Sequence, residues 1–128
     1  MWRFFFVVVL IVACATGAAA GPREDADFAF LSGDYALAAR LFRPLAEQGD
    51  ARAQVYLGML YTEGQGIPQD FIRAHMWYTV AAAALSGDDG KATMKRRDDV
   101  ASRMTAAQME KAQEMARRCQ QSKFKECD

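Results

Sequence analysis

Two closely spaced glycines are the first residues in this sequence with a pattern that could do chemistry. The stretch LYTEGQGIPQDFIRAHMWYTVAAA (60–83) places Gly64 and Gly66 just before Pro68. Glycine-rich loops can cradle phosphate, but they follow a strand and include a third glycine or a lysine, and neither occurs here. The pair instead predicts an elbow between two helices. Gly64 would end the first in a left-handed conformation, and Asp70 would cap the second.

The other chemically suggestive residues do not combine into a site. His75 is the only histidine, with no cysteine or serine evidently paired with it and no Cys/His cluster for a metal, so we expect an exposed or groove-lining side chain. The run Lys95–Arg97 is partly neutralised by Asp98–Asp99 and predicts a solvated helix face, without a nucleic-acid partner. Asp88–Asp89 follow a glycine turn and predict a helix cap. We therefore predict no catalytic residue, cofactor site or metal site.

The N-terminal segment has the pattern of a secretory signal. One positive charge at Arg3 precedes the apolar run Phe4–Ala15, and a tail of small residues ends at Ala20. The run is too short to span a membrane as a helix, so we predict a signal peptide over residues 1–20, cleaved after Ala20. Alternatively, Ile11–Cys14 resembles a bacterial lipobox, which would leave Cys14 lipidated and the protein anchored.

Composition and cysteine count fit an exported globular domain. About half of the 128 residues are apolar (52%) and a quarter are charged (25%), which excludes a disordered chain and leaves room for one small domain. Removing the signal leaves two cysteines, Cys119 and Cys127. An even number in an exported chain predicts a disulfide, which would tie the last residues to the final helix.

The remaining sequence predicts helices that repeat. No period-two alternation of β-branched residues occurs, and alanine is abundant. Asp34–Tyr35 aligns with Asp70–Phe71 at an offset of 36, and matched apolar positions follow at helical spacing. A further helix, 51–62, lies between the two related helices. This is the arrangement of an all-α fold, a short α-solenoid of antiparallel helix hairpins.

The stretch ARAQVYLGMLYTEGQGIPQDFIRAHMWYTVAAA (51–83) resembles a Sel-one-like repeat, a relative of the tetratricopeptide repeat. Glycine at position 58 lets the facing helix approach closely, with Ala74 or Ala81 as the expected neighbour. The motif positions that we expect to be structural are Leu57, Gly58, Tyr61, Gly64, Gly66, Pro68, Asp70, Ala74, Trp77, Tyr78 and Ala81.

The resemblance also implies the domain layout. Residues 21–50 form an N-terminal helical hairpin, a degenerate repeat, and residues 51–88 a complete repeat. Residues 89–128 form a C-terminal helical cap that carries the disulfide. The capping helix is expected over about 106–120, because Thr105 and Gln108 have the spacing of a capping box.

Stacked hairpins present a concave surface lined by the first helix of each pair, and such surfaces bind peptides or proteins. The side chains on the 51–62 helix that the core pattern does not use are Arg52, Val55, Tyr56 and Met59, which we predict as partner-binding residues. The alternative for Tyr56 is packing against the N-terminal hairpin.

The resemblance implies a non-enzymatic adaptor or regulator in the envelope of a Gram-negative bacterium. Its partner would be a protein or peptide, and its location the periplasm, with secretion or lipid anchoring as alternatives. Two other functions remain open. One is a cell-wall ligand-binding protein or hydrolase of the penicillin-binding Sel-one-like type, although this chain lacks the cysteine pair which those proteins carry in each repeat. The other is a structural subunit of an envelope complex. Because the array is short, either the cap completes the core or the protein dimerises.

Overall fold

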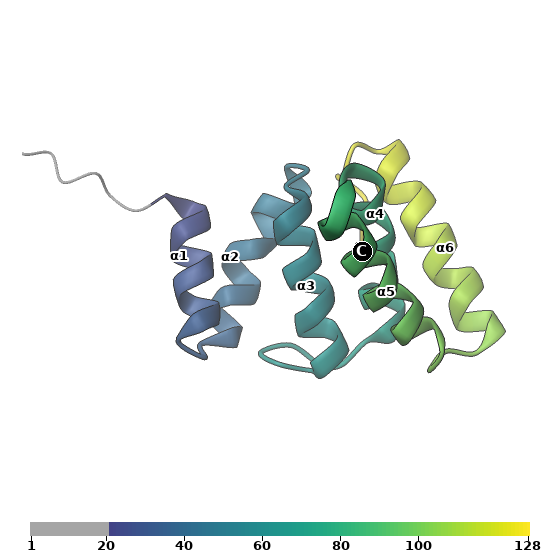
Figure 1. Cartoon of the computed structure of the whole chain (residues 1–128), viewed down its shortest axis with the longest axis horizontal. Coiled ribbons are helices and arrows are strands. Elements are labelled where there is room, and N and C mark those ends of the chain that lie inside the picture. The colour runs from purple at the N-terminus through teal and green to yellow at the C-terminus, as the bar shows by residue number, and fades with distance from the viewer. Residues whose placement is uncertain (1–20) are drawn as a thin grey trace, which may run out of the picture.

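The computed structural model describes residues 21–128 and contains six α-helices, with α1 at one end of its long axis and α6 at the other (Figure 1). No strand occurs within this range, which confirms the all-α prediction. The predicted signal segment and Cys14 lie outside the described residues. No helix in residues 21–128 combines the length and the apolar character needed to cross a bilayer. The helices are α1 (Pro22–Leu31), α2 (Tyr35–Glu47), α3 (Ala51–Glu63), α4 (Phe71–Ala84), α5 (Gly87–Ala101) and α6 (Ala106–Gln121).

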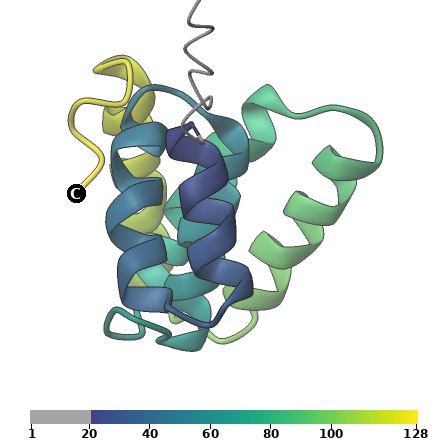
Figure 2. The ribbon, with the colours of Figure 1, turned by 90° about the vertical axis from the view of Figure 1, so that its left-hand side faces the viewer.

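Successive helices pack in the order of a solenoid. α1 packs on α2, α2 on α3, α3 on α4 and α4 on α5. The last helix departs from this order, because the principal contact of α6 is also α4 rather than α5. Figure 2 looks along the solenoid. In this view α5 lies on one side of the α1–α2 pair, and α6 lies on the other side, behind that pair. The C-terminal helices therefore clasp α4 from two sides, where the sequence suggested a single capping helix.

The glycine-rich stretch is the elbow that its spacing predicted. Gly64 ends α3 in the left-handed region, with φ of 64°. Asp70 is the N-cap of α4, and its carboxylate accepts a hydrogen bond of 3.0 Å from the backbone N–H of Arg73. The backbone N–H of Asp70 donates to the carbonyl of Tyr61 at 3.0 Å, which ties the end of the loop to α3. The loop is thus a helix–helix connection.

The motif side chains form the core. Leu57, Trp77 and Tyr78 are among the largest fully buried side chains. The expected partner of Gly58 was wrong: the nearest atoms belong to the ring of Tyr78, and a Cβ on Gly58 would lie 2.5 Å from Tyr78 Cε1. The tyrosine ring fills the space above the glycine. The glycine therefore admits an aromatic ring between α3 and α4, where we expected an alanine.

The prediction that Asp88–Asp89 cap a helix was wrong. Ser86 is the N-cap of α5, and both aspartates lie in the first turn. Their charges still stabilise the N-terminus of the helix, where unpaired N–H groups concentrate positive potential.

The predicted capping box of α6 is confirmed. The Gln108 N–H donates to Thr105 Oγ1 at 3.2 Å, and the Thr105 N–H donates to Gln108 Oε1 at 2.9 Å.

The predicted disulfide is present between Cys119, in α6, and Cys127, eight residues further on. Both cysteines are buried. The bridge holds residues 122–128, which follow α6, against the body of the domain.

Reduction of this disulfide should lower the free energy of unfolding by about 2–3 kcal/mol, because the closed loop no longer restricts the unfolded chain. Chemical denaturation of the chain with and without a dithiol measures the difference. A Cys119→Ser/Cys127→Ser variant is the control, and its stability should not respond to the dithiol. Equal stability of the oxidised and reduced wild type would contradict the expected contribution.

Candidate functional site

A hollow of about 510 Å³ lies on the surface between α3 and α5. One wall is the exposed face of α3 and the other is α5, with the end of α1 closing one side. All four residues predicted to bind a partner line this hollow. Its lining consists of Phe30, Arg52, Val55, Tyr56, Met59, Leu85, Asp89, Ala92, Thr93 and Arg96.

Tyr56 has two structural roles. Its ring stacks on Phe42 with centroids 4.6 Å apart and an interplanar angle of 8°, and it lies 4.7 Å from the ring of Phe30. These contacts join α3 to the N-terminal hairpin, as the alternative for Tyr56 proposed. The side chain is only partly buried and also lines the hollow. The two interpretations of Tyr56 are therefore compatible.

The second wall was not predicted. Leu85, Asp89, Ala92, Thr93 and Arg96 recur at spacings of three and four residues, so they share one face of α5 and the turn before it. The same periodicity is visible in the sequence, but α5 carries none of the large apolar motif residues that identify the repeat. A search for helical spacing alone could have found this face.

A smaller hollow of about 190 Å³ continues along α3 and shares Met59 and Arg96 with the first. We call the two hollows together the α3–α5 groove. In the smaller one the hydroxyl of Tyr78 lies 3.3 Å from Thr62 Oγ1. Burial raises the pKa of Tyr78, so its hydroxyl remains protonated and offers a hydrogen bond.

Cations lie on both walls of the groove. Arg52 on α3 donates a hydrogen bond of 3.4 Å to the hydroxyl of Tyr56 and forms an ion pair of 3.1 Å with Asp27. The hydrogen bond to Tyr56 is the main cause that raises the pKa of Arg52. Arg96 on α5 is exposed and makes no ion pair with the residues that the structure describes. The groove therefore combines an apolar floor with a cation free to meet a ligand.

The side chains that line the groove provide binding groups. Within residues 21–128, no group of three or more His, Cys, Asp or Glu side chains is arranged to hold a metal ion. The groove itself contains no histidine or cysteine. Its lining is suited to apolar contact, hydrogen bonding and charge pairing, which are the interactions of peptide recognition.

His75 does not lie where the sequence suggested. It is buried in α4, with 5% of its surface exposed, and does not line the groove. Its Nδ1 lies 3.4 Å from Thr79 Oγ1. Burial is the main cause that lowers the pKa of His75, and the nearby Arg97 lowers it further. The histidine is therefore a neutral core residue.

Acidification should destabilise the fold through His75. Its folded pKa lies below the ordinary 6.5, so the unfolded state binds more protons between these two values. The free energy of unfolding should stay constant above about pH 6.5 and fall as the pH drops from there through the folded pKa. Denaturation between pH 8 and 5 measures this change. A His75→Gln variant should show a flatter profile, and an equal slope in both proteins would contradict the role of His75.

Comparison with protein families supports the interpretation of the hairpins. The Sel1 repeat model matches residues 27–50, which contain the second half of α1 and all of α2, and residues 51–84, which contain α3 and α4. No curated protein and no solved structure gives a significant match. Sel1 repeats generally mediate protein–protein interaction and are typically non-enzymatic. The chain therefore contains two consecutive Sel1 repeats, over residues 27–84.

Proposed function

We propose that this chain is a non-enzymatic interaction module that binds a segment of a partner protein in the α3–α5 groove. The observation that supports this most directly is the open space between α3 and α5. α3 and α5 both pack on α4 but make little contact with each other. The hollow of about 510 Å³ between them can accept several side chains of a peptide.

The chemistry of the groove favours a mainly apolar ligand segment. Val55, Met59 and Ala92 provide apolar contact from both walls, and Tyr56 provides a rigid aromatic surface. Tyrosine and methionine are both enriched at protein interfaces, where their side chains bury a large area. Arg96, in reach of both hollows, offers a charge-assisted hydrogen bond that would orient the segment.

We further propose that the module acts after export, as an adaptor or regulator in the bacterial periplasm. The signal-like pattern of residues 1–20 supports export. The disulfide supports an oxidising compartment, because such bridges are rare in the reducing cytosol.

A site-specific photo-crosslinker in place of Met59 tests the groove. Tyr56 is a poorer position, because replacing it would break the stack on Phe42. The control is the same crosslinker at Met94, which lies on α5 with 41% exposure and outside the groove. In the source cell, one protein should be captured at position 59 and not at position 94. Equal capture at both positions, or none at 59, would count against the groove.

A charge placed in the groove provides an independent test. Val55→Glu should abolish capture at position 59 while the far-ultraviolet circular dichroism stays that of the wild type. The matched variant Leu31→Glu changes an apolar residue with 82% exposure outside the groove and should leave capture unchanged.

A further inference from the structure

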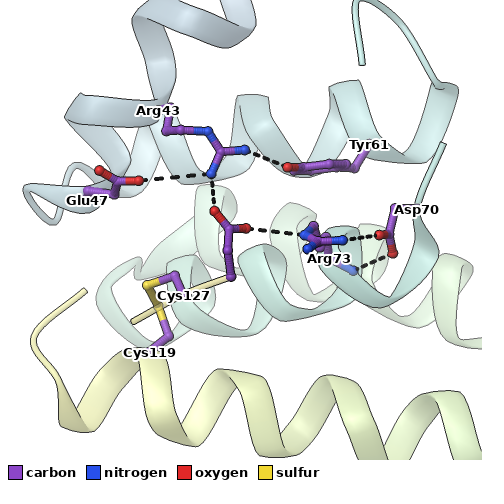
Figure 3. A network of polar contacts seen from close by, with 8 residues as sticks. Arg43, Glu47, Tyr61, Asp70, Arg73, Cys119 and Cys127 are labelled. Carbon is purple, nitrogen blue, oxygen red and sulfur yellow. Dashed lines mark hydrogen bonds and ion pairs between the residues drawn. A yellow bond between two sulfur atoms is a disulfide. The ribbon is translucent and has the colours of Figure 1, made fainter. Parts of the chain in front are cut away.

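A carboxylate is held between two arginines on a face of the molecule that shares no residue with the groove. Asp128 accepts hydrogen bonds from Arg43, on α2, and Arg73, on α4, and both arginines are labelled in Figure 3. Arg43 Nη1 donates to Asp128 Oδ2, and Arg73 Nε donates to Asp128 Oδ1 at 3.2 Å. Each carboxylate oxygen thus accepts from a guanidinium of a different repeat. Such charge-assisted pairs are stronger and more directional than neutral hydrogen bonds.

Other contacts position both arginines independently of Asp128. Arg43 Nη2 donates to the hydroxyl of Tyr61 at 2.6 Å, and Arg43 Nη1 lies 3.9 Å from Glu47. Arg73 Nη1 donates to Asp70, the N-cap of α4, at 2.7 Å. The two guanidinium groups therefore keep these contacts when Asp128 leaves them. We call Arg43, Tyr61 and Arg73 the arginine clamp.

The arginine clamp is reachable from solvent. The side chains of Arg43 and Arg73 are 34% and 39% exposed, and that of Asp128 is 40% exposed. Burial alone would lower the pKa of Arg43, but the charge of Asp128 and the contact with Tyr61 outweigh it and raise the pKa. The clamp remains cationic, so its preferred ligand is an anion with two oxygens.

The segment that delivers Asp128 is held under backbone strain. Lys123 and Phe124 have φ of 53° and 68°, in the left-handed region that residues other than glycine rarely adopt. The turn is held by the packing of Phe124 against the core, by the hydrogen bond of 2.8 Å from the Phe124 N–H to the Cys119 carbonyl, by the disulfide at Cys127 and by the clamp at Asp128. Opening the disulfide removes the covalent attachment, which is the one next to Asp128 in the sequence.

We propose that the arginine clamp is a carboxylate-binding site for an acidic side chain of a partner peptide, and that Asp128 is its removable internal competitor. Release follows reduction of the Cys119–Cys127 bridge by a dithiol. The S–S bond breaks and two cysteine thiols form, taking two electrons and two protons from the dithiol, which closes to its own disulfide. The strained turn then relaxes, and the local concentration of Asp128 at the clamp falls.

The test uses the full chain from residue 21 with Cys127→Ser and Asp128→Ala, which frees the segment and empties the clamp. The probe is the peptide Ser-Lys-Phe-Lys-Glu-Ser-Asp, corresponding to residues 122–128 with Cys127→Ser, and the control peptide ends in Asn. Calorimetry should show the acidic peptide binding this variant at least roughly tenfold more tightly than the control peptide. The oxidised wild type should bind neither peptide, and the reduced wild type should bind the acidic one weakly.

Arginine variants assign the binding to the clamp. Arg43→Gln or Arg73→Gln in the same background should remove the preference for the acidic peptide. The matched control is Arg40→Gln, which changes an exposed arginine of α2 that is not in the clamp. A folded double variant that binds neither peptide, or binds both equally, would overturn the proposal.

A second measurement applies if the double variant does not fold. Asp128→Ala alone keeps the disulfide and leaves the clamp empty. Addition of succinate should then shift the side-chain Nε–H resonances of Arg43 and Arg73 in nuclear magnetic resonance spectra, and should not shift them in the wild type. Unchanged resonances in Asp128→Ala would refute the carboxylate site.

Discussion

The Trp77→Ala variant should lose about 3–5 kcal/mol of unfolding free energy, the loss expected when a large aromatic side chain is removed from a packed core. Trp77 has no exposed surface, and it lies on α4, the helix that contacts α3, α5 and α6. Because α4 is held on several sides, the helices around it have little freedom to collapse into the space left. Urea denaturation followed by circular dichroism measures the loss.

Two further variants make this result interpretable. The indole Nε1 of Trp77 has no hydrogen-bond partner among the described residues, so Trp77→Phe removes an unsatisfied donor while keeping most of the apolar volume. It should lose much less than Trp77→Ala. Met94→Ala, at a side chain with 41% exposure, should change stability by no more than about 0.5 kcal/mol. A Trp77→Ala protein as stable as Met94→Ala would show that the core does not depend on the indole.

The repeat is the part of this molecule that its sequence predicts well. The elbow around Gly64, the cap at Asp70 and the buried Trp77 all follow from local rules that act within one helix or one turn. The four predicted groove residues also lie together, because residues 52, 55, 56 and 59 share one helix face by spacing alone. Helical periodicity and capping therefore carry most of the information on α3 and α4.

Contacts between distant elements were not predictable in the same way. The neighbour of Gly58 depends on how α4 is rotated against α3, which spacing within one helix does not determine. Asp128 contacts Arg43 and Arg73, which lie 85 and 55 positions earlier in the sequence. No local sequence pattern therefore predicts the clamp. His75 was expected to be exposed or to line a groove, because the sequence pairs it with no catalytic or metal-binding partner. Its helix, α4, is in fact covered by three others and is buried nearly all round.

The second large effect is expected at Gly66, where two costs add. The residue has φ of 72°, which an alanine adopts at a cost of about 1–2 kcal/mol. A Cβ there would also collide with the backbone of Tyr35 and Ala36, at the start of α2. Neither backbone atom can move aside without shifting that helix, and overpacking of this kind costs about 1–3 kcal/mol. We therefore expect Gly66→Ala to lose about 2–5 kcal/mol of unfolding free energy.

Gly33 separates the two costs. It has φ of 82°, but a Cβ there would meet nothing within 4 Å, so Gly33→Ala should show the backbone strain alone. Parallel denaturation of the two variants gives the collision by difference. A substantial difference would mean that the elbow of the second repeat packs directly on the first, so that Gly66 sets how closely the repeats stack. Equal losses would mean that the loop yields freely, and the stacking would then depend on the contacts between the helices alone.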